Sequence, residues 1–161
     1  MKITGILVSF ILVCTLYVHA QKCKMYQVNY CEPYGIPFDY SIQSRSFATQ
    51  SGQTYTLKLV VYKDYEYSVR LCTGRKINQV SFSISEEGGE KQVFYDNSED
   101  NKLEKQFVAS RAMPLLIQVT VINDDYKEKE KIDKTDECLG ILIEYYRPPK
   151  KKDKKKSADK E

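Results

Sequence analysis

The stretch SGQTYTLKLVVYKDYEYSVRLCT, residues 51–73, decides the fold class of this chain. Apolar side chains recur at every second position from Tyr55 to Val61 and again from Tyr65 to Leu71, and most positions between them are polar. This alternation indicates β-strands with one face buried and the other in water. Because only residues 62–64 separate the two strands, we expect them to form a hairpin.

The same two-residue period extends along the rest of the chain. It predicts strands over Val80–Ile84, Leu115–Val121 and Leu139–Tyr145, and shorter strands over Met25–Tyr30, Arg45–Thr49, Gln92–Tyr95 and Lys105–Ala109. Glu86–Glu90 contains two glycines, which predicts a second hairpin turn. About nine strands at short spacing favour an all-β fold, an antiparallel β-sandwich or jelly roll of about 8–9 strands.

The first twenty residues read as a secretory signal peptide. Lys2 precedes an apolar run from Ile6 to Val18, and small residues flank His19 at the end of that run. This pattern predicts cleavage before Gln21 and export to the periplasm or beyond the cell. Two alternatives are an uncleaved membrane anchor and a lipoprotein signal with Cys14 as the lipidated residue. The mature β-domain would then span 21–146.

Cleavage would leave four cysteines, Cys23, Cys31, Cys72 and Cys138. An even number of cysteines in an exported chain predicts disulfides, and four cysteines allow three connectivities. We expect the pairs Cys23–Cys31 and Cys72–Cys138. The gaps between successive cysteines are 8, 41 and 66 residues (31 − 23, 72 − 31 and 138 − 72), which do not fit the paired CxxC spacing of a zinc site.

Composition limits the chemistry of the mature chain. The single histidine, His19, lies in the leader, so Ser-His-Asp and Cys-His catalysis, histidine-ligated zinc and histidine-ligated haem are excluded once the leader is removed. Neither a GxxxxGK[ST] nor a GxGxxG motif is present. We therefore expect a non-catalytic protein without a cofactor. The alternative is a small hydrolase that uses paired carboxylates.

One acidic segment has the residue types of a calcium loop. Asp96, Ser98 and Asp100 follow the alternate spacing with which a loop places oxygen ligands around calcium, although the remaining EF-hand positions do not match. Asp124 and Asp125 would be further ligands if the loops are close. A calcium-dependent adhesion or matrix module is therefore an alternative function. A polar turn between two strands explains the same residues.

The charge of the chain is concentrated at its C-terminus. Residues 147–161 hold eight Lys/Arg and three Asp/Glu, a net charge of 8 − 3 = +5, whereas residues 21–146 carry 16 − 19 = −3. This tail has almost no apolar residue, which predicts disorder. It predicts either attachment to an anionic surface, such as phospholipid head groups or acidic glycan, or a solubilising role; nucleic acid is the less expected partner. Exposed tyrosines of the mature chain could stack on sugars, but tyrosine also suits strands.

Three segments together resemble a family of exported modules. The run 51–73, QVSFSISEEGGEKQVFYDN at 79–97 and MPLLIQVTVIN at 113–123 are similar to the jelly-roll pre-peptidase C-terminal domains of exported bacterial proteins, and more loosely to GOLD domains. Gly52-Gln53-Thr54-Tyr55 matches the Gly-x-x-Tyr strand of that family, and the leader resembles those of Bacteroidetes exported proteins. At 112–114 this chain departs from the Gly-x-Tyr of the family. The resemblance implies a non-catalytic accessory module.

Overall fold

A computed structural model describes residues 23–88, 92–123 and 137–149. Apart from one short helix, the regular elements of these residues are strands. In chain order they are α2 (Tyr26–Asn29), β1 (Asp39–Tyr40), β2 (Arg45–Ala48), β3 (Thr54–Val61), β4 (Glu66–Thr73), β5 (Gln79–Glu86), β6 (Val93–Asp96), β7 (Glu104–Val108), β8 (Met113–Asn123) and β9 (Cys138–Tyr146).

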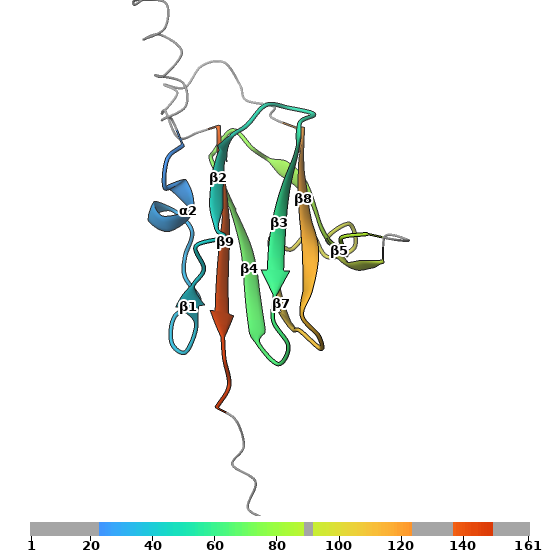
Figure 1. Cartoon of the computed structure of the whole chain (residues 1–161). Helices are drawn as coiled ribbons and strands as arrows, with labels where there is room; N and C mark the ends of the chain where they lie inside the picture. Colours follow the sequence, from blue (N-terminus) through green and yellow to red (C-terminus); the bar gives the residue numbers. More distant parts are fainter. Residues whose placement is uncertain (1–22, 89–91, 124–136, 150–161) are drawn as a thin grey trace, which may run out of the picture.

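The strands form two antiparallel sheets that pack face to face (Figure 1). One sheet has the order β3-β8-β5-β6. In the other, β4 lies between β7 and β9, and the far edge of β9 pairs first with β2 and then with β1. The predicted antiparallel β-sandwich is confirmed, and so is the second hairpin, because β5 and β6 are neighbours.

The core lies between the sheets and consists of the inward members of the alternating runs. Its fully buried side chains are Leu59, Val61, Val69, Phe82, Ile84, Leu115, Ile117, Val119, Val121, Leu139, Ile141 and Ile143. Each comes from a segment whose alternation predicted a strand, so the period-two pattern located the core residue by residue.

The first predicted hairpin is wrong, because β3 and β4 belong to different sheets. The link between them crosses the sandwich: Leu59 and Val61 face the core from one sheet, and Val69 faces it from the other. Sheets pack about 10 Å apart, a distance that four linking residues can span. The link is fixed where the Tyr62 amide donates to the Tyr67 hydroxyl at 2.9 Å. The strands β3 and β4, each with one apolar face, thus bury these faces against each other across the sandwich instead of pairing edge to edge.

The strand predicted over Met25–Tyr30 is also wrong, because this segment contains α2. The flanking cysteines explain the helix. Cys23 is bonded to Cys138 of β9, and Cys31 is bonded to Cys72 of the neighbouring strand β4. An extended chain between positions 23 and 31 would span about 26 Å. Diagonal neighbours on adjacent strands are only about 7–8 Å apart, so the chain has to fold back on itself.

The disulfide pairing therefore differs from the expected one, although all four cysteines are oxidised as predicted. The long bridge joins Cys23 to Cys138 and the short bridge joins Cys31 to Cys72, with Cα–Cα distances of 5.5 and 5.2 Å. In the register of β4 and β9, Cys72 lies opposite Gly140, two residues beyond Cys138. Such a diagonal offset exceeds the usual Cα–Cα range of a disulfide, so the expected Cys72–Cys138 pair does not form.

Candidate functional site

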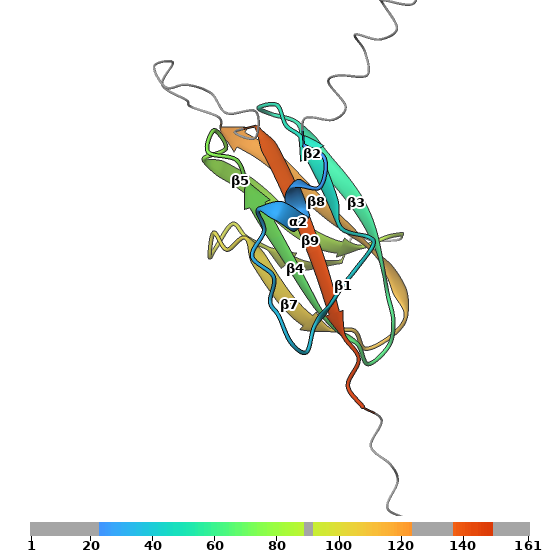
Figure 2. The ribbon, with the colours of Figure 1, turned by 90° about the vertical axis from the view of Figure 1, so that its left-hand side faces the viewer.

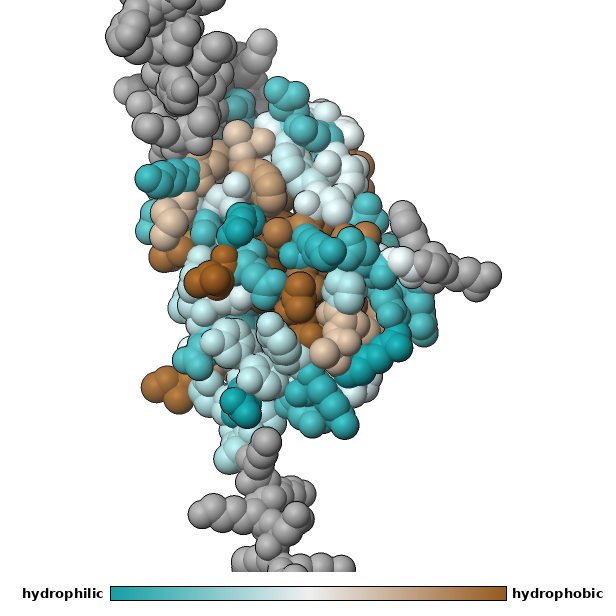
Figure 3. Space-filling model, in the orientation of Figure 1, coloured by the Kyte–Doolittle hydropathy of each residue, from teal (hydrophilic) through white to brown (hydrophobic). Residues whose placement is uncertain are grey.

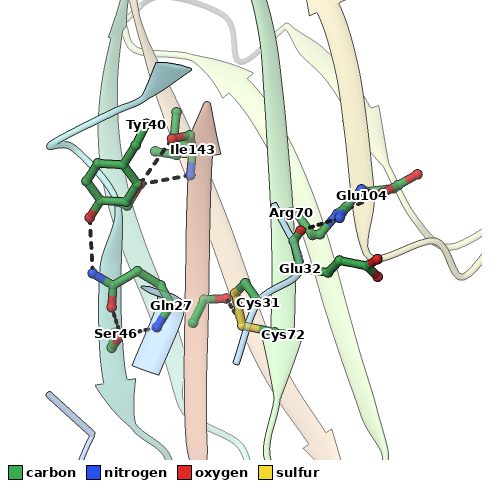
Figure 4. Close-up of a disulfide and its surroundings, with 11 residues drawn as sticks. Gln27, Cys31, Glu32, Tyr40, Ser46, Arg70, Cys72, Glu104 and Ile143 are labelled. Carbon is green, nitrogen blue, oxygen red and sulfur yellow. Dashed lines mark hydrogen bonds and ion pairs between the residues drawn. A yellow bond between two sulfur atoms is a disulfide. The ribbon is translucent and has the colours of Figure 1, made fainter. Parts of the chain in front are cut away.

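The segment 23–38, which we call the N-terminal cap, covers the outer face of β9. Residues Cys138–Glu144 are all buried, so this strand is enclosed on both sides, by the core and by the cap. Figure 4 shows the short bridge between the cap and β4, with Arg70 beside it. Arg70 donates to Glu104 Oε2 at 2.6 and 2.9 Å and to the Glu32 carbonyl, and so joins the cap to β4 and β7.

Gly140 allows the cap to lie this close. A Cβ at this position would lie 2.6 Å from Cys72 Sγ, 2.9 Å from the Cα of Gln27 and 3.0 Å from Cys31 Sγ. Its backbone is an ordinary strand conformation, so the need for glycine here is close approach and not a positive φ.

Beyond the short bridge the cap ends in a tight turn, residues 34–38, which we call the Ile36 turn. The Tyr34 amide donates to Glu144 Oε2 at 2.8 Å, so a buried carboxylate holds the base of the turn. The Phe38 amide donates to the Gly35 carbonyl at 2.8 Å, and Gly35 has a φ of +85°, which glycine adopts readily. The Ile36 side chain lies at the tip and is 99% exposed.

Aromatic rings gather beside this turn at one end of the sandwich. Phe38 lies 4.9 Å from Tyr34 and 6.1 Å from Tyr146, measured between ring centroids. On the other side of β9, Tyr65 lies 6.0 Å from Tyr145 and 5.9 Å from Tyr62. We call these six residues the aromatic end.

The described chain ends at this same place. The register pairs Asp39 with Tyr145 and Glu66 with Tyr146, so the Ile36 turn and the β3–β4 link both lie at the C-terminal end of β9. Figure 1 shows the chain leaving β9 there. The Arg147 guanidinium lies 5.6 Å from the centroid of the Tyr65 ring. The aromatic end therefore adjoins the start of the lysine-rich segment.

A hollow of about 450 Å³ separates α2 from β2, and Lys24, Gln27, Arg45 and Ser46 are among its lining residues. Several polar groups of this lining already have hydrogen-bond partners. Gln27 contacts Ser46 and donates to the Tyr40 hydroxyl, and Arg45 Nη1 donates to two backbone carbonyls. A second hollow, of about 350 Å³, lies where Thr73, Gln79 and Leu103 approach one another. Among the described residues that line the two hollows, there is no Asp or Glu.

The face of the molecule that carries β2 and β3 has apolar side chains along the opening between the sheets (Figure 3). Part of this opening is closed by Gln43. Its side-chain amide donates to the Val60 carbonyl at 3.3 Å and accepts from the Val60 amide at 2.9 Å, as a neighbouring strand would. This contact covers one end of the exposed edge of β3.

The predicted calcium residues form the turn after β6. Asp96 Oδ1 accepts from the Ser98 amide at 2.8 Å, and this turn lowers the pKa of Asp96, mainly through its hydrogen bonds to Ser98. Asp100 Oδ1 accepts from the Lys102 amide at 3.0 Å and from the Tyr95 hydroxyl at 2.9 Å. The Lys102 bond is the main cause of the lowered pKa of Asp100. The structure thus brings the predicted residues together in one turn.

Within the described residues, no three His, Cys, Asp or Glu side chains are grouped to hold a metal ion. Asp124 and Asp125, the predicted additional ligands, lie outside the described residues, as do the leader and most of the tail. The calcium hypothesis therefore stays a prediction.

Other carboxylates of the described residues bond to cations across neighbouring elements. Lys76 Nζ lies 2.7 Å from Glu137 Oε1, Arg111 lies 2.5 Å from Glu86, and Lys58 contacts Glu87. These ion pairs connect different elements and account for their carboxylates structurally. The Ile36 turn and the aromatic end are the features that sequence reasoning missed. The glycine and proline beside Ile36 are typical of a loop, but they carry no sign of which side chain points outward.

Comparison with known proteins leaves the function open. No protein-family model matches the chain, and no curated protein matches it. Among solved structures, the crystal structure of Aeromonas hydrophila PliG, a periplasmic lysozyme inhibitor of g-type lysozyme, is similar over 67% of this chain and 83% of that chain, with 15% identity and a TM-score of 0.38. Similarity of this degree does not indicate what the chain binds. The resemblance to pre-peptidase C-terminal and GOLD domains is not supported by a family match.

Among the described residues, no helix is long and apolar enough to cross a bilayer.

Proposed function

We propose that this chain is an exported, non-catalytic β-sandwich protein that works at the cell envelope, where its lysine-rich tail holds it on an anionic surface. In this proposal residues 1–20 are a cleaved signal peptide, residues 21–146 are the binding domain, and residues 147–161 are the attachment segment. The observation that carries the proposal is the position of the aromatic end, next to the point where the chain continues into the basic segment.

The chemistry of that end supports a surface role. Tyr34 and Tyr62 are 48% and 57% exposed, and Ile36, two residues after Tyr34, is 99% exposed. Tyrosine has an apolar ring and a polar tip, and is enriched where a protein meets a boundary between water and an apolar phase. Seven lysines follow within residues 150–161. Lysines near an anionic membrane surface each contribute about 1 kcal/mol of attraction.

The scaffold supports the export part of the proposal. Two disulfides connect the N-terminal cap to the sheet, and structural disulfides persist in oxidising compartments such as the periplasm. The body of the mature protein carries a net charge of −3, so attraction to an anionic surface has to come from the tail.

Co-sedimentation with vesicles tests the proposal. The mature protein, a form that lacks residues 148–161 and a form with the seven tail lysines changed to glutamine would be compared on phosphatidylcholine vesicles that contain phosphatidylglycerol. At low salt, we expect the mature protein to bind the vesicles and the truncated and glutamine forms not to bind. Binding of the mature protein should decline steeply as the Debye length shortens from about 30 Å at 0.01 M salt to about 8 Å at 0.15 M.

The glutamine form keeps the length of the tail and removes its charge, so it separates electrostatic attraction from any other effect of the segment. Equal binding by all three forms, or no binding by any of them, overturns the proposal. The non-catalytic part is tested separately with glycan and ester substrates. Turnover that a single Asp or Glu substitution abolishes would establish the hydrolase alternative.

A further inference from the structure

The Ile36 turn presents an apolar side chain that nothing in the described structure covers. At 99% exposure, Ile36 has an essentially complete water-facing surface, although isoleucine is among the residues most often buried. Single exposed apolar residues are common on protein surfaces. Ile36 differs from these because of its position at a projecting tip and because of the residues around it.

The tip is held firmly in place. The Gly35 carbonyl accepts a hydrogen bond from the Phe38 amide, and the Tyr34 and Phe38 rings of the turn make an edge-to-face contact. Glu144 of the buried strand β9 fixes the Tyr34 amide, and the short bridge fixes the chain a few residues earlier. Because the turn is ordered before it meets a partner, little conformational entropy remains to be lost on binding.

The surroundings favour a lipid surface over a pocket in another protein. A protein hot spot is normally ringed by residues that exclude water around it. Here Ile36 is almost fully exposed, and Tyr34 and Tyr62, at the same end of the sandwich, have about half of each side chain exposed. An apolar tip with tyrosines behind it matches the layering of a bilayer, in which acyl chains lie below an interface that aromatic residues prefer.

The charge of this end has to be overcome by the tail. The exposed carboxylates Asp39 and Asp64 at this end would be repelled by an anionic surface, and the net charge of +5 in residues 147–161 has to outweigh them. One apolar group binds membranes only marginally, and stable attachment takes a second signal such as a polybasic segment. The chain places both signals at the C-terminal end of β9.

We propose that the Ile36 turn inserts into the interface of an anionic phospholipid leaflet while the lysine-rich tail binds the head groups around it. This inference rests on the proposed function and specifies its surface, because an acidic glycan would satisfy the tail but would offer no apolar layer for Ile36.

The chain contains no tryptophan, so a single introduced tryptophan reports its own environment. Ile36→Trp is the probe. Ile42→Trp is the matched control, because Ile42 is also apolar and 85% exposed but follows Ser41, whose amide bonds to Ile143, further from the end of β9. Each mature, full-length variant would be mixed with vesicles of phosphatidylcholine and phosphatidylglycerol, with and without brominated acyl chains.

We expect the emission of Ile36→Trp to shift to the blue and to be quenched by the brominated lipid, whereas Ile42→Trp keeps the emission of an exposed indole. If both variants co-sediment with vesicles and neither shifts, the tail attaches the protein without insertion of the turn; the present inference then fails and the proposed function stands. If neither variant co-sediments, the proposed function fails as well.

A charge substitution supplies the second arm. Ile36→Asp should lower the affinity of the mature protein for these vesicles about tenfold, because an apolar contact is replaced by a carboxylate facing anionic lipid. Binding to a soluble acidic polysaccharide should fall much less, and Ile42→Asp should behave in the vesicle assay like the unmodified protein. An equal loss of affinity for vesicles and polysaccharide would assign the turn to glycan recognition and overturn the lipid assignment. An unchanged thermal unfolding profile would show that the fold is intact.

Discussion

Gly140→Ala gives the sharpest test of the contact between the N-terminal cap and β9. The added methyl group would lie 2.6 Å from Cys72 Sγ, 2.9 Å from the Cα of Gln27 and 3.0 Å from Cys31 Sγ. Neither type of neighbour can swing away, since the two sulfurs are bonded to each other and the third atom is backbone. Forcing a methylene-sized group into a packed core typically costs about 1–3 kcal/mol, and we expect a loss near 2–3 kcal/mol here.

The sign of the change is as informative as its size. Glycine inside a strand is less favourable than alanine by about 0.5–1 kcal/mol, because it loses more conformational freedom on folding. Without the cap and the Cys31–Cys72 bridge against it, Gly140→Ala would therefore stabilise the protein. Urea unfolding of the oxidised mature protein measures the difference, with the midpoint and the slope fitted separately so that a change in the unfolded state is recognised.

A double-mutant cycle assigns the cost to the bridge. Replacing both Cys31 and Cys72 by alanine removes two of the three close atoms, so the cost of Gly140→Ala should fall by about 1 kcal/mol or more in that background. A Gly140→Ala protein as stable as the original, or a cost that is unchanged without the short bridge, would refute the reasoning.

Three further predictions concern bridges, pH and calcium. Non-reducing peptide mapping should find only the long and the short bridge; in the loop-entropy relation, removing them costs about 5 and about 4 kcal/mol for sequence separations of 115 and 41 residues. Burial, followed by the hydrogen bond to Asp100, raises the pKa of Tyr95 from 10.0 to about 12. The fold thus favours the protonated phenol, the resulting stability is lost as the pH rises from 10 towards 12, and alkaline urea titrations of Tyr95→Phe should show a smaller loss. The calcium hypothesis predicts a binding heat at millimolar calcium that Asp96→Ala abolishes; calorimetry without any heat rejects it.

The strands and their buried faces were predictable because the two-residue period is a local property of the sequence. In β3, β4, β5, β8 and β9 the alternation predicts the inward positions, and Leu59, Phe82, Ile117 and Ile141 are fully buried as it requires. The pattern does not determine which strand or sheet each amphipathic strand packs against. An amphipathic strand needs an apolar surface to face, and that surface can belong to the strand beside it or to the opposite sheet. The β3–β4 link was assigned to a hairpin for this reason.

The cap was unpredictable for a related reason. Apolar and polar residues alternate from Tyr26 to Tyr30, which locally favours a strand, but the conformation of this segment is set by the two cysteines that flank it. Pairing neighbours in sequence suggested a small loop closed between Cys23 and Cys31. Instead, each of the two adjacent strands β9 and β4 carries one cysteine that bonds to the cap, Cys138 or Cys72. The helix forms because the chain between Cys23 and Cys31 is longer than the distance between these two strand cysteines. Only the register of β4 against β9 contains this information.

The candidate site shows the same dependence on β9. Tyr34 and Glu144 are 110 residues apart in sequence, yet one hydrogen bond between them fixes the base of the Ile36 turn. The last strand therefore does three things at once: it completes the core with Ile141 and Ile143, carries the cap on its outer face, and delivers the chain to the aromatic end. Figure 2 shows the cap crossing in front of this strand. Because the basic segment begins where β9 ends, the turn and the lysines keep a fixed starting point relative to each other. A polybasic segment elsewhere on the domain would leave the orientation of the turn towards a surface undetermined.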